Sequence, residues 1–256
     1  MFFDSHVHTS FSTDSEMQAK DALAKAEELG IGLVFTEHLD IGFPGDVPYL
    51  FDPEEYWKEY SPLRGEHLLL GVEVGMRQET CEESLAFTDR APFDVVVGSL
   101  HVLEDYDLYE PEIYGTRDKK ELYHDYLMAM ARAIYHHGFI DVLAHIDYIA
   151  RYAAYEDPSL NYDEFAQDID EVLRALVVTD TVLELNTKRL TGWDAIKELM
   201  PIYCRYRELG GRYITIGSDA HTPDAIGRNF HLAEEFVEEC SLHPVIFCER
   251  RMDITS

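Results

Sequence analysis

Two histidines separated by a single residue stand near the start of the chain. His6 and His8 follow the apolar entry Phe2-Phe3. In a β-strand, residues i and i+2 point to the same face of the sheet. Their imidazoles would therefore lie side by side, which is an arrangement that a divalent metal ion can use. Because such pairs are common in proteins, this pair alone is weak evidence for a metal site.

More histidines and carboxylates recur at the ends of later strand-like stretches. This set comprises His38, Glu73, His101, His145, Asp219 and, just past the seventh stretch, His221. With the first pair it contains six of the twelve histidines. Parallel strands of a barrel bring their carboxyl ends to one rim, where active sites lie. We therefore predict a metal centre at that rim. Asp14, in the first loop, is a further candidate ligand, although a helix-capping role would suit it equally.

The elements that must position these residues alternate along the whole chain. The strand-like stretches cover residues 2–9, 33–38, 68–73, 94–101, 142–145, 182–186 and 213–219. Helix-like stretches separate them, which indicates parallel strands. The strands are almost continuously apolar, as strands covered on both faces should be. We predict an α/β fold, a seven-stranded (β/α) barrel close to the TIM type. Because no linker, repeat or low-complexity stretch divides it, we predict a single domain spanning residues 1–256.

Several local features carry separate expectations. Residues 102–117 and 148–160 read as long loops, the first of them on the rim of the active site. Ser15 and the three residues after it resemble a capping box, which predicts a helix from there to Leu29. A later helix, 193–209, contains Pro201 and is expected to kink or break at that residue.

Composition excludes several classes of function. The chain has 50 acidic and 21 basic residues, a net charge of −29, which repels a phosphate backbone and argues against a nucleic-acid partner. No apolar run approaches the about 20 residues of a membrane span. The four cysteines are scattered without a CxxC motif and read as free thiols. Since the first strand begins at Phe2, no room remains for a cleaved signal peptide. We expect an acidic cytoplasmic enzyme with no membrane partner, and leave its oligomeric state open.

Together these segments resemble the polymerase and histidinol phosphatase (PHP) family of metal-dependent phosphoesterases. The matching segments are Asp4-Ser5-His6-Val7-His8-Thr9, Phe35-Thr36-Glu37-His38, Gly71-Val72-Glu73, Gly98-Ser99-Leu100-His101, Ala144-His145-Ile146-Asp147 and Gly217-Ser218-Asp219-Ala220-His221. They span nearly the whole chain. The resemblance implies a distorted seven-stranded (β/α) barrel that holds a cluster of two to three divalent metal ions.

The resemblance also implies which residues hold each ion. The ligands of the first would be His6, His8, Glu73 and Asp219. Glu73 would bridge to a second ion, completed by His101 and His145. Asp14, His38 and His221 would hold the third. Mixed nitrogen and oxygen ligands of this kind suit zinc, manganese or iron.

Within the family, the chain resembles the histidinol-phosphate phosphatase branch through residues 102–107, 147–152 and 184–187. This implies hydrolysis of L-histidinol phosphate to L-histidinol and phosphate, in histidine biosynthesis, by a metal-bound hydroxide. Glu73 and Asp219 would act as ligands of the hydroxide-activating metals, because divalent metals lower the pKa of bound water towards about 7. The alternatives are a phosphatase for another small phosphate ester or a nucleotide, and a non-catalytic metal-binding module.

Candidates for recognising the substrate are arginines and acids in the loops. Arg151 and Arg189 follow strand-end motifs, and a guanidinium pairs well with phosphate, although either could simply balance the acidic surface. The branch often has a small residue followed by Leu-Arg after its Asn-Thr pair, whereas this chain has Lys188-Arg189-Leu190. Asp147 is a candidate partner for a ligand histidine. The acids of the loop after His101, which are Glu104, Asp105, Asp107 and Glu110, could pair with the substrate amine.

Overall fold

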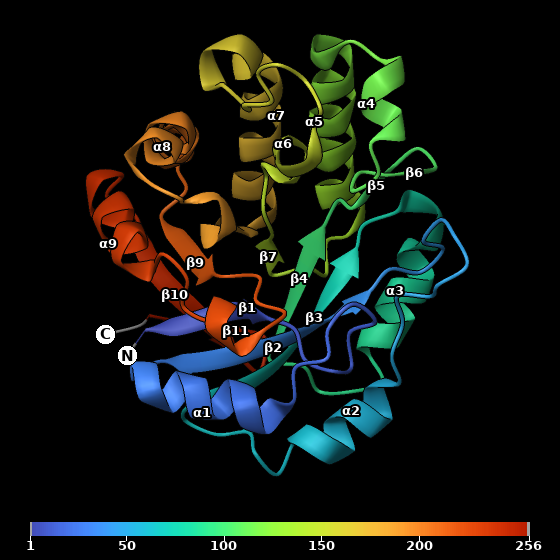
Figure 1. The fold of residues 1–256 in the computed structure, drawn as a ribbon, viewed down its shortest axis with the longest axis vertical. Helices are drawn as coiled ribbons and strands as arrows, with labels where there is room; N and C mark the ends of the chain where they lie inside the picture. Colours follow the sequence, from blue (N-terminus) through green and yellow to red (C-terminus); the bar gives the residue numbers. More distant parts are fainter. Residues whose placement is uncertain (1, 255–256) are drawn as a thin grey trace.

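Seven parallel strands form the framework on which the expected ligands lie (Figure 1). The structure, a computed structural model, describes residues 2–254. In the order in which they pair, the strands are β1 (Phe3–Val7), β2 (Gly32–Leu39), β3 (Leu68–Gly75), β4 (Val95–Ser99), β7 (Val142–Leu143), β8 (Val182–Asn186) and β9 (Tyr213–Gly217). Every neighbouring pair in this series is parallel.

The two ends of this series meet and close a barrel. Val7 and Ala220 form a parallel bridge. The backbone N–H of His8 donates to the carbonyl of Ala220 at 2.8 Å, and the N–H of Ala220 donates to the carbonyl of His6 at 3.3 Å. Only a single bridge joins the first and last strands of the barrel, and β7 pairs with each of its neighbours through only two residues. The predicted α/β barrel is therefore confirmed, in a distorted form.

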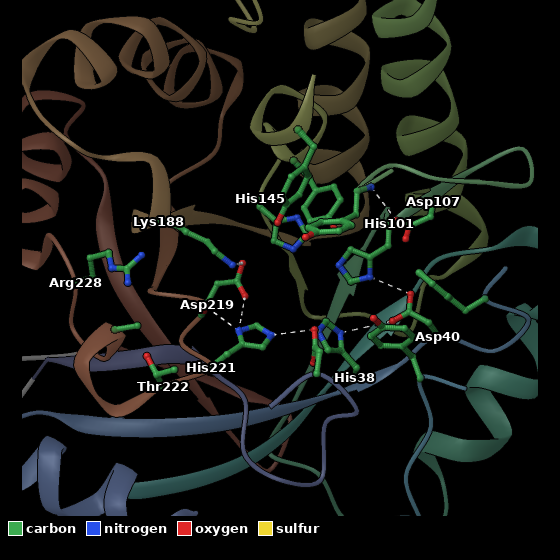
Figure 2. Close-up of a pocket in the computed structure, with 17 residues that line it drawn as sticks. His38, Asp40, His101, Asp107, His145, Lys188, Asp219, His221, Thr222 and Arg228 are labelled. Carbon is green, nitrogen blue, oxygen red and sulfur yellow. Dashed lines mark hydrogen bonds and ion pairs between the residues drawn. The ribbon is translucent and has the colours of Figure 1, made fainter. Parts of the chain in front are cut away.

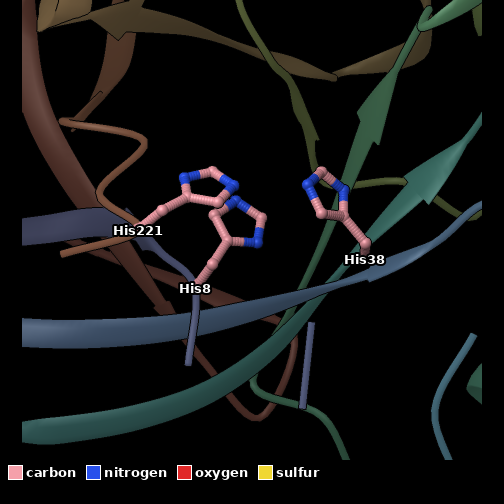
Figure 3. Close-up of side chains that lie close together, drawn as sticks. All are labelled: His8, His38 and His221. Carbon is pink, nitrogen blue, oxygen red and sulfur yellow. The ribbon is translucent and has the colours of Figure 1, made fainter. Parts of the chain in front are cut away.

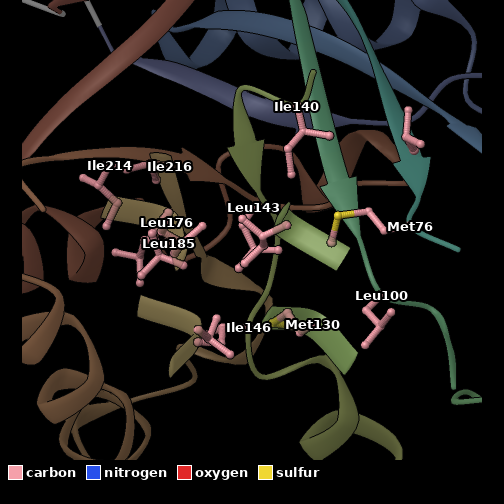
Figure 4. Packing of buried hydrophobic residues seen from close by; sticks show 14 of the residues in the cluster. Met76, Leu100, Met130, Ile140, Leu143, Ile146, Leu176, Leu185, Ile214 and Ile216 are labelled. Atoms are coloured by element: carbon pink, nitrogen blue, oxygen red, sulfur yellow. The ribbon is translucent and has the colours of Figure 1, made fainter. Parts of the chain in front are cut away.

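Successive side chains of a strand point to opposite faces, and this alternation divides the hydrophobic core into an outer and an inner cluster. On β2, Leu33 and Phe35 face the outer cluster, whereas Val34 faces the inner one. The outer cluster lies between the strands and the helices and includes Leu143, Leu185 and their neighbours in Figure 4. The inner cluster fills the barrel near the amino ends of its strands. The interior positions nearer the carboxyl ends of the strands are polar, so the expected metal ligands lie directly above this inner apolar cluster.

Helices cover the outside of the barrel (Figure 1). They are α1 (Ala19–Leu29), α2 (Pro53–Tyr60), α3 (Cys81–Thr88), α5 (Lys119–His136), α7 (Tyr162–Thr179), α8 (Trp193–Leu209) and α9 (Phe230–Glu239). A kink or break was expected at Pro201, but α8 continues through this residue as one helix. Residues beyond the proline, such as Ile202 and Tyr206, are buried and anchor the second half of the helix. Within residues 2–254, the longest helices remain too short or too polar to span a bilayer.

A hairpin that follows the barrel closes its base. It consists of β10 (His243–Cys248) and β11 (Arg251–Ile254), which pair antiparallel. β10 also pairs with the start of β9, and its Val245 and Phe247 join the inner cluster. Asp94, directly before β4, holds the hairpin turn, since its carboxylate accepts from the N–H of Glu249 at 2.9 Å. The sequence pattern predicts only a tail over residues 245–256, whereas the structure has this hairpin in its described part.

The connections expected as loops contain short elements. Residues 102–117 form the hairpin of β5 (Val102–Leu103) and β6 (Tyr106–Asp107), followed by α4 (Glu112–Thr116). The second connection begins with α6 (Tyr148–Tyr152). The capping box expected at Ser15 does not form, and α1 starts only at Ala19. The hydroxyl of Ser15 instead donates to the carbonyls of His8 and His221, at 3.1 and 3.2 Å, so it ties the loop after β1 to the site.

Candidate metal centre

Glu73 stands at the centre of the expected ligands, fully buried at the end of β3. Its Oε2 lies 3.2 Å from His6 Nε2, 3.4 Å from His8 Nε2 and 3.0 Å from His38 Nδ1. Three imidazoles from β1, the loop after it and β2 thus surround one carboxylate oxygen. Its other oxygen is shared with a different pair of histidines.

That second pair approaches from β4 and β7. Glu73 Oε1 lies 3.4 Å from His101 Nε2 and 3.0 Å from His145 Nε2. The hydroxyl of Ser99 also donates to Oε1. A carboxylate whose two oxygens each face different imidazoles is suited to bridge two metal ions, which is the role predicted for Glu73.

The remaining expected ligands lie on the open side of the same cluster. Asp14 Oδ2 is 3.5 Å from His38 Nε2 and 3.3 Å from His221 Nε2. Asp219 Oδ1 is 3.6 Å from both His8 Nε2 and His221 Nδ1. Figure 3 shows His8, His38 and His221, which come from three separate segments, with their rings gathered together. All nine expected ligands therefore meet at one rim, although which atom holds which ion stays a prediction.

Unpaired buried atoms show that this donor set fits metal ions. Three groups of residues have ligand atoms within 4.8 Å of one another, namely His6–His8–Glu73, His8–His38–His221 and His38–Glu73–His101. Within residues 2–254, His6 Nε2, His8 Nε2, His38 Nδ1 and Glu73 Oε2 are buried without a hydrogen bond. The three nitrogens lie 3.0–3.4 Å from Glu73 Oε2, but none of them forms a hydrogen bond of acceptable geometry with it. Each unpaired buried polar atom costs about 1–3 kcal/mol, and a divalent cation among them would remove that cost.

The charges of the cluster shift its pKa values in opposite directions. Burial alone would lower the pKa of His6, but Glu73 and Glu184 outweigh burial and hold that pKa well above its usual range. Burial, with His38 and His221 next, pushes the pKa of His8 well below its usual range. Burial would raise the pKa of Glu73, yet the neighbouring histidines hold it well below the usual value. The cluster thus combines ionised carboxylate with closely spaced imidazoles, whose protons a metal would displace.

Three residues that sequence reasoning missed bind the outer nitrogens of ligand histidines. Glu184 Oε1 lies 2.6 Å from His6 Nδ1, Asp40 Oδ1 lies 2.9 Å from His101 Nδ1, and Ser12 Oγ lies 3.0 Å from His8 Nδ1. Spacing offered a signal only for Asp40, which follows the expected ligand His38 by two residues, whereas nothing in the spacing of Glu184 links it to His6. Asp147, expected to hold a ligand histidine, instead accepts from Arg189 Nη1 at 2.9 Å.

The two arginines expected to bind phosphate take different positions. Arg189 is held by Asp147 and, at 3.0 Å, by Glu198, and it does not line the cavity. Arg151 is buried and donates through Nη1 to Asp219 Oδ2 at 2.6 Å. The neighbouring Lys188 does line the cavity, with its Nζ 3.3 Å from the same oxygen of Asp219. Of the two adjacent cations, Lys188 therefore reaches the cavity and Arg189 does not.

A cavity of about 490 Å³ opens above the cluster. Its wall includes the rings of Phe43, Tyr49, Tyr109, Tyr148 and Tyr152. Figure 2 shows Lys188 and Arg228 on one side of it and Asp107 on the other.

Among the four acids expected to read the amine, only Asp107 lines this cavity. Asp105 pairs with Arg77 at 3.0 Å and Glu104 with Arg117 at 3.6 Å, so both are held outside it. The cavity can therefore accommodate a molecule with an anionic end, a ring and a cationic group.

Comparison with known proteins gives one consistent family. The PHP domain matches residues 4–188. The chain is 46% identical over 252 residues to the probable histidinol-phosphatase of Clostridium acetobutylicum, covering 98% of this chain and 99% of that protein. It is 30% identical to the histidinol-phosphatase of Lactococcus lactis subsp. lactis, covering 94% and 91% of the two chains.

A solved structure agrees with these relatives. The crystal structure of histidinol phosphate phosphatase from Lactococcus lactis, complexed with zinc, L-histidinol and phosphate, superposes with a TM-score of 0.93 at 30% identity and covers 98% of each chain. The likeness therefore extends over the barrel and its connections together.

Proposed function

The chain belongs to the PHP domain family, and from that premise we propose that it hydrolyses L-histidinol phosphate to L-histidinol and phosphate in histidine biosynthesis. One observation carries the proposal beyond the names of its relatives. A single cavity has the buried His/Glu cluster at its base, cations on one side and a carboxylate beside aromatic rings on the other. The phosphate of histidinol phosphate would face the metal cluster and the cations, and its amine and imidazole would face the carboxylate and the aromatic rings.

We propose that the nine clustered residues hold two to three divalent transition-metal ions, with zinc as the first candidate because the Lactococcus lactis enzyme was crystallised with it. Bound there, such ions lower the pKa of water and neutralise phosphoryl oxygens. Asp219 is itself held in place by Arg151. This buried ion pair fixes the carboxylate, so the arginine contributes by positioning Asp219.

The phosphate would be oriented by two cations of the cavity wall. Lys188 contacts only one oxygen of Asp219, at 3.3 Å, and has further N–H donors free to turn towards a ligand. Arg228 makes no ion pair with any residue in the range 2–254 and lines the same side (Figure 2). An unpaired guanidinium beside a metal cluster is well suited to bind phosphate oxygens.

The amine and imidazole of the substrate would face the opposite wall. Asp107 is half-buried, and its Oδ1 accepts from the N–H of Tyr109 at 2.8 Å, which fixes the carboxylate at the cavity edge. A cationic amine pairs with an ionised carboxylate, and an imidazole stacks against tyrosine rings. Asp107 is therefore proposed to read the amine.

All four cysteines carry free thiols, which supports the cytoplasm as the place of action.

Substrate choice is tested by phosphate release with added zinc or manganese. The substrates would be L-histidinol phosphate, a panel of sugar phosphates and nucleotides, and p-nitrophenyl phosphate. We expect the highest kcat/KM for L-histidinol phosphate, because only that ester supplies both the amine and the imidazole. An equal or higher value for another ester would overturn the substrate assignment while keeping the enzyme class. No release from any of them would indicate a metal-binding module without catalysis.

A further inference from the structure

Among the seven barrel strands described, β8 is the one that has no expected metal ligand either within it or in the two residues that follow it. It carries Glu184 instead, whose side chain points into the barrel and is 1% exposed. Its carboxylate reaches the outer nitrogen of a ligand from the first strand, because Oε1 lies 2.6 Å from His6 Nδ1. β8 is thus joined to the metal cluster through one histidine.

The other oxygen of Glu184 is also occupied. Oε2 accepts from the backbone N–H of His145 at 2.9 Å and from Nδ2 of Asn186 at 3.0 Å. The Asn186 amide is oriented by its own oxygen, which accepts from the N–H of Lys188 at 3.1 Å. Two of the three groups around Glu184 are fixed donors, the N–H of His145 and the amide of Asn186. Burial would raise the pKa of Glu184, but its neighbours, chiefly His6, lower that pKa below its usual value. Because the carboxylate is therefore ionised and can only accept, His6 Nδ1 must be the third donor.

This arrangement decides which nitrogen of His6 is free. A neutral imidazole has one N–H donor and one acceptor nitrogen. When Nδ1–H donates to Glu184, the lone pair of Nε2 points at the cluster around Glu73, where Nε2 is buried without a hydrogen bond to any residue of the described chain. The hydrogen bond on one side thus prepares the ligand atom on the other.

We propose that Glu184 is a positioning residue that holds His6 in the tautomer and orientation in which it binds metal. The inference rests on the metal centre of the proposed function. Gly217 on β9 supports it independently, because a Cβ there would lie 2.5 Å from Glu184 Oε1 and 2.4 Å from His6 Cβ. Only a glycine leaves room for these two side chains to meet.

Glutamine at this position has the same size but cannot serve all three donors. If its amide oxygen faces His145 and Asn186, its NH₂ faces His6 Nδ1 and favours the tautomer with the proton on Nε2. If the amide is turned round, its NH₂ faces two other donors. Glu184→Gln is therefore expected to weaken metal binding at His6 while leaving side-chain volume unchanged.

The experiment measures zinc affinity by competition with a chromophoric chelator, and zinc content by elemental analysis, on the full-length protein without substrate. We expect Glu184→Gln to lose about 10- to 100-fold in affinity for at least one zinc ion. The matched control is Asp170→Asn on α7. That buried carboxylate also faces only donors, including Arg205 Nη2 at 2.7 Å and Tyr162 Oη at 3.0 Å, but it lies away from the cluster. Asp170→Asn should lower stability and keep zinc affinity.

Wild-type zinc affinity in Glu184→Gln would overturn the proposal, and so would an equal loss of affinity in Asp170→Asn. Should Glu184→Gln fail to fold, nitrogen NMR of histidine-labelled, zinc-loaded wild-type protein decides the matter. A proton on His6 Nδ1 with Nε2 bound to zinc is expected, and the opposite tautomer would refute the role. Since neither readout uses substrate, a protein that binds zinc as expected but does not hydrolyse histidinol phosphate would contradict only the proposed substrate.

Discussion

Replacing Asp107 by asparagine tests how the cavity selects its substrate. The change keeps the size of the side chain and an oxygen for the N–H of Tyr109, 2.8 Å away, so the β5–β6 hairpin should keep its shape. What is removed is the negative charge facing the cavity. A hydrogen bond to a charged group contributes about 1.5–3 kcal/mol. Because Asp107 is only half-buried, water screens part of that interaction.

We therefore expect a loss of about 1.4 kcal/mol, which is about tenfold in kcat/KM on L-histidinol phosphate. p-Nitrophenyl phosphate has no amine, so its kcat/KM should change less than about twofold. The matched control is Asp105→Asn in the same hairpin, where the side chain is 90% exposed and faces Arg77. It should leave the ratio of the two substrates unchanged. Equal losses on both substrates in Asp107→Asn, or none on either, would refute the idea that Asp107 reads the amine.

Acidity should mimic this substitution in the wild-type protein. Burial, and then Glu110, raise the pKa of Asp107 above its usual value, against the opposing effects of the Tyr109 N–H and His101. As the pH falls through this raised pKa, the carboxylate takes up a proton and loses its charge. The ratio of kcat/KM for the two substrates should fall with it, whereas in Asp107→Asn the ratio should stay flat over the same range.

Further predictions address the metals, the phosphate and the base of the barrel. Protein prepared without chelator should contain more than one equivalent of transition metal by elemental analysis, because the cluster offers more ligands than one tetrahedral site can use; one equivalent or less in active enzyme would contradict this. Glu73→Ala should abolish turnover and lower metal content, whereas His124→Ala, on the exposed face of α5, should change neither; near-normal turnover in Glu73→Ala would count against the site. Lys188→Gln should raise KM on both L-histidinol phosphate and p-nitrophenyl phosphate more than Arg189→Gln does, because only Lys188 lines the cavity; the reverse order would restore the original assignment of Arg189. Phe247→Ala should lower the free energy of unfolding by about 3–5 kcal/mol, the usual cost of removing a buried phenylalanine; chemical denaturation measures it, and a change below about 1 kcal/mol would show that the base is not packed as described.

The ligand positions were predictable because two simple rules combine. Side chains alternate along a strand, and parallel strands end at one rim, so Glu73 and His145 are marked by their place at strand ends. Those rules do not say which acids lie behind the ligands. Glu184 and Asp40 are two of 50 acidic residues, and only the packed barrel shows that each reaches the outer nitrogen of a histidine.

The positions at which the structure differs from these expectations have equally local causes. Lys188 and Arg189 lie in a 3₁₀ turn, Thr187–Arg189, where one residue turns the side chain by about a third of a circle. Pattern reasoning could not choose between two adjacent cations that point in such different directions. Ser15 has the sequence of a helix cap, but its hydroxyl donates to the carbonyls of His8 and His221, and its oxygen accepts from the N–H of Met17 at 3.3 Å, before the helix begins. Tertiary hydrogen bonds thus overrode a local signal.

The β10–β11 hairpin has a consequence for how the protein is made. Val245 and Phe247 fill the base of a barrel whose first wall, β1, leaves the ribosome long before them. Until the hairpin has been synthesised, the apolar side chains of Phe3, Val34 and Leu69 stay exposed at the amino-terminal end of the barrel. Contacts between residues so distant in sequence form slowly and leave apolar surface open to aggregation in the meantime. A nascent chain arrested before His243 would therefore carry every expected metal ligand and still need a chaperone to stay in solution.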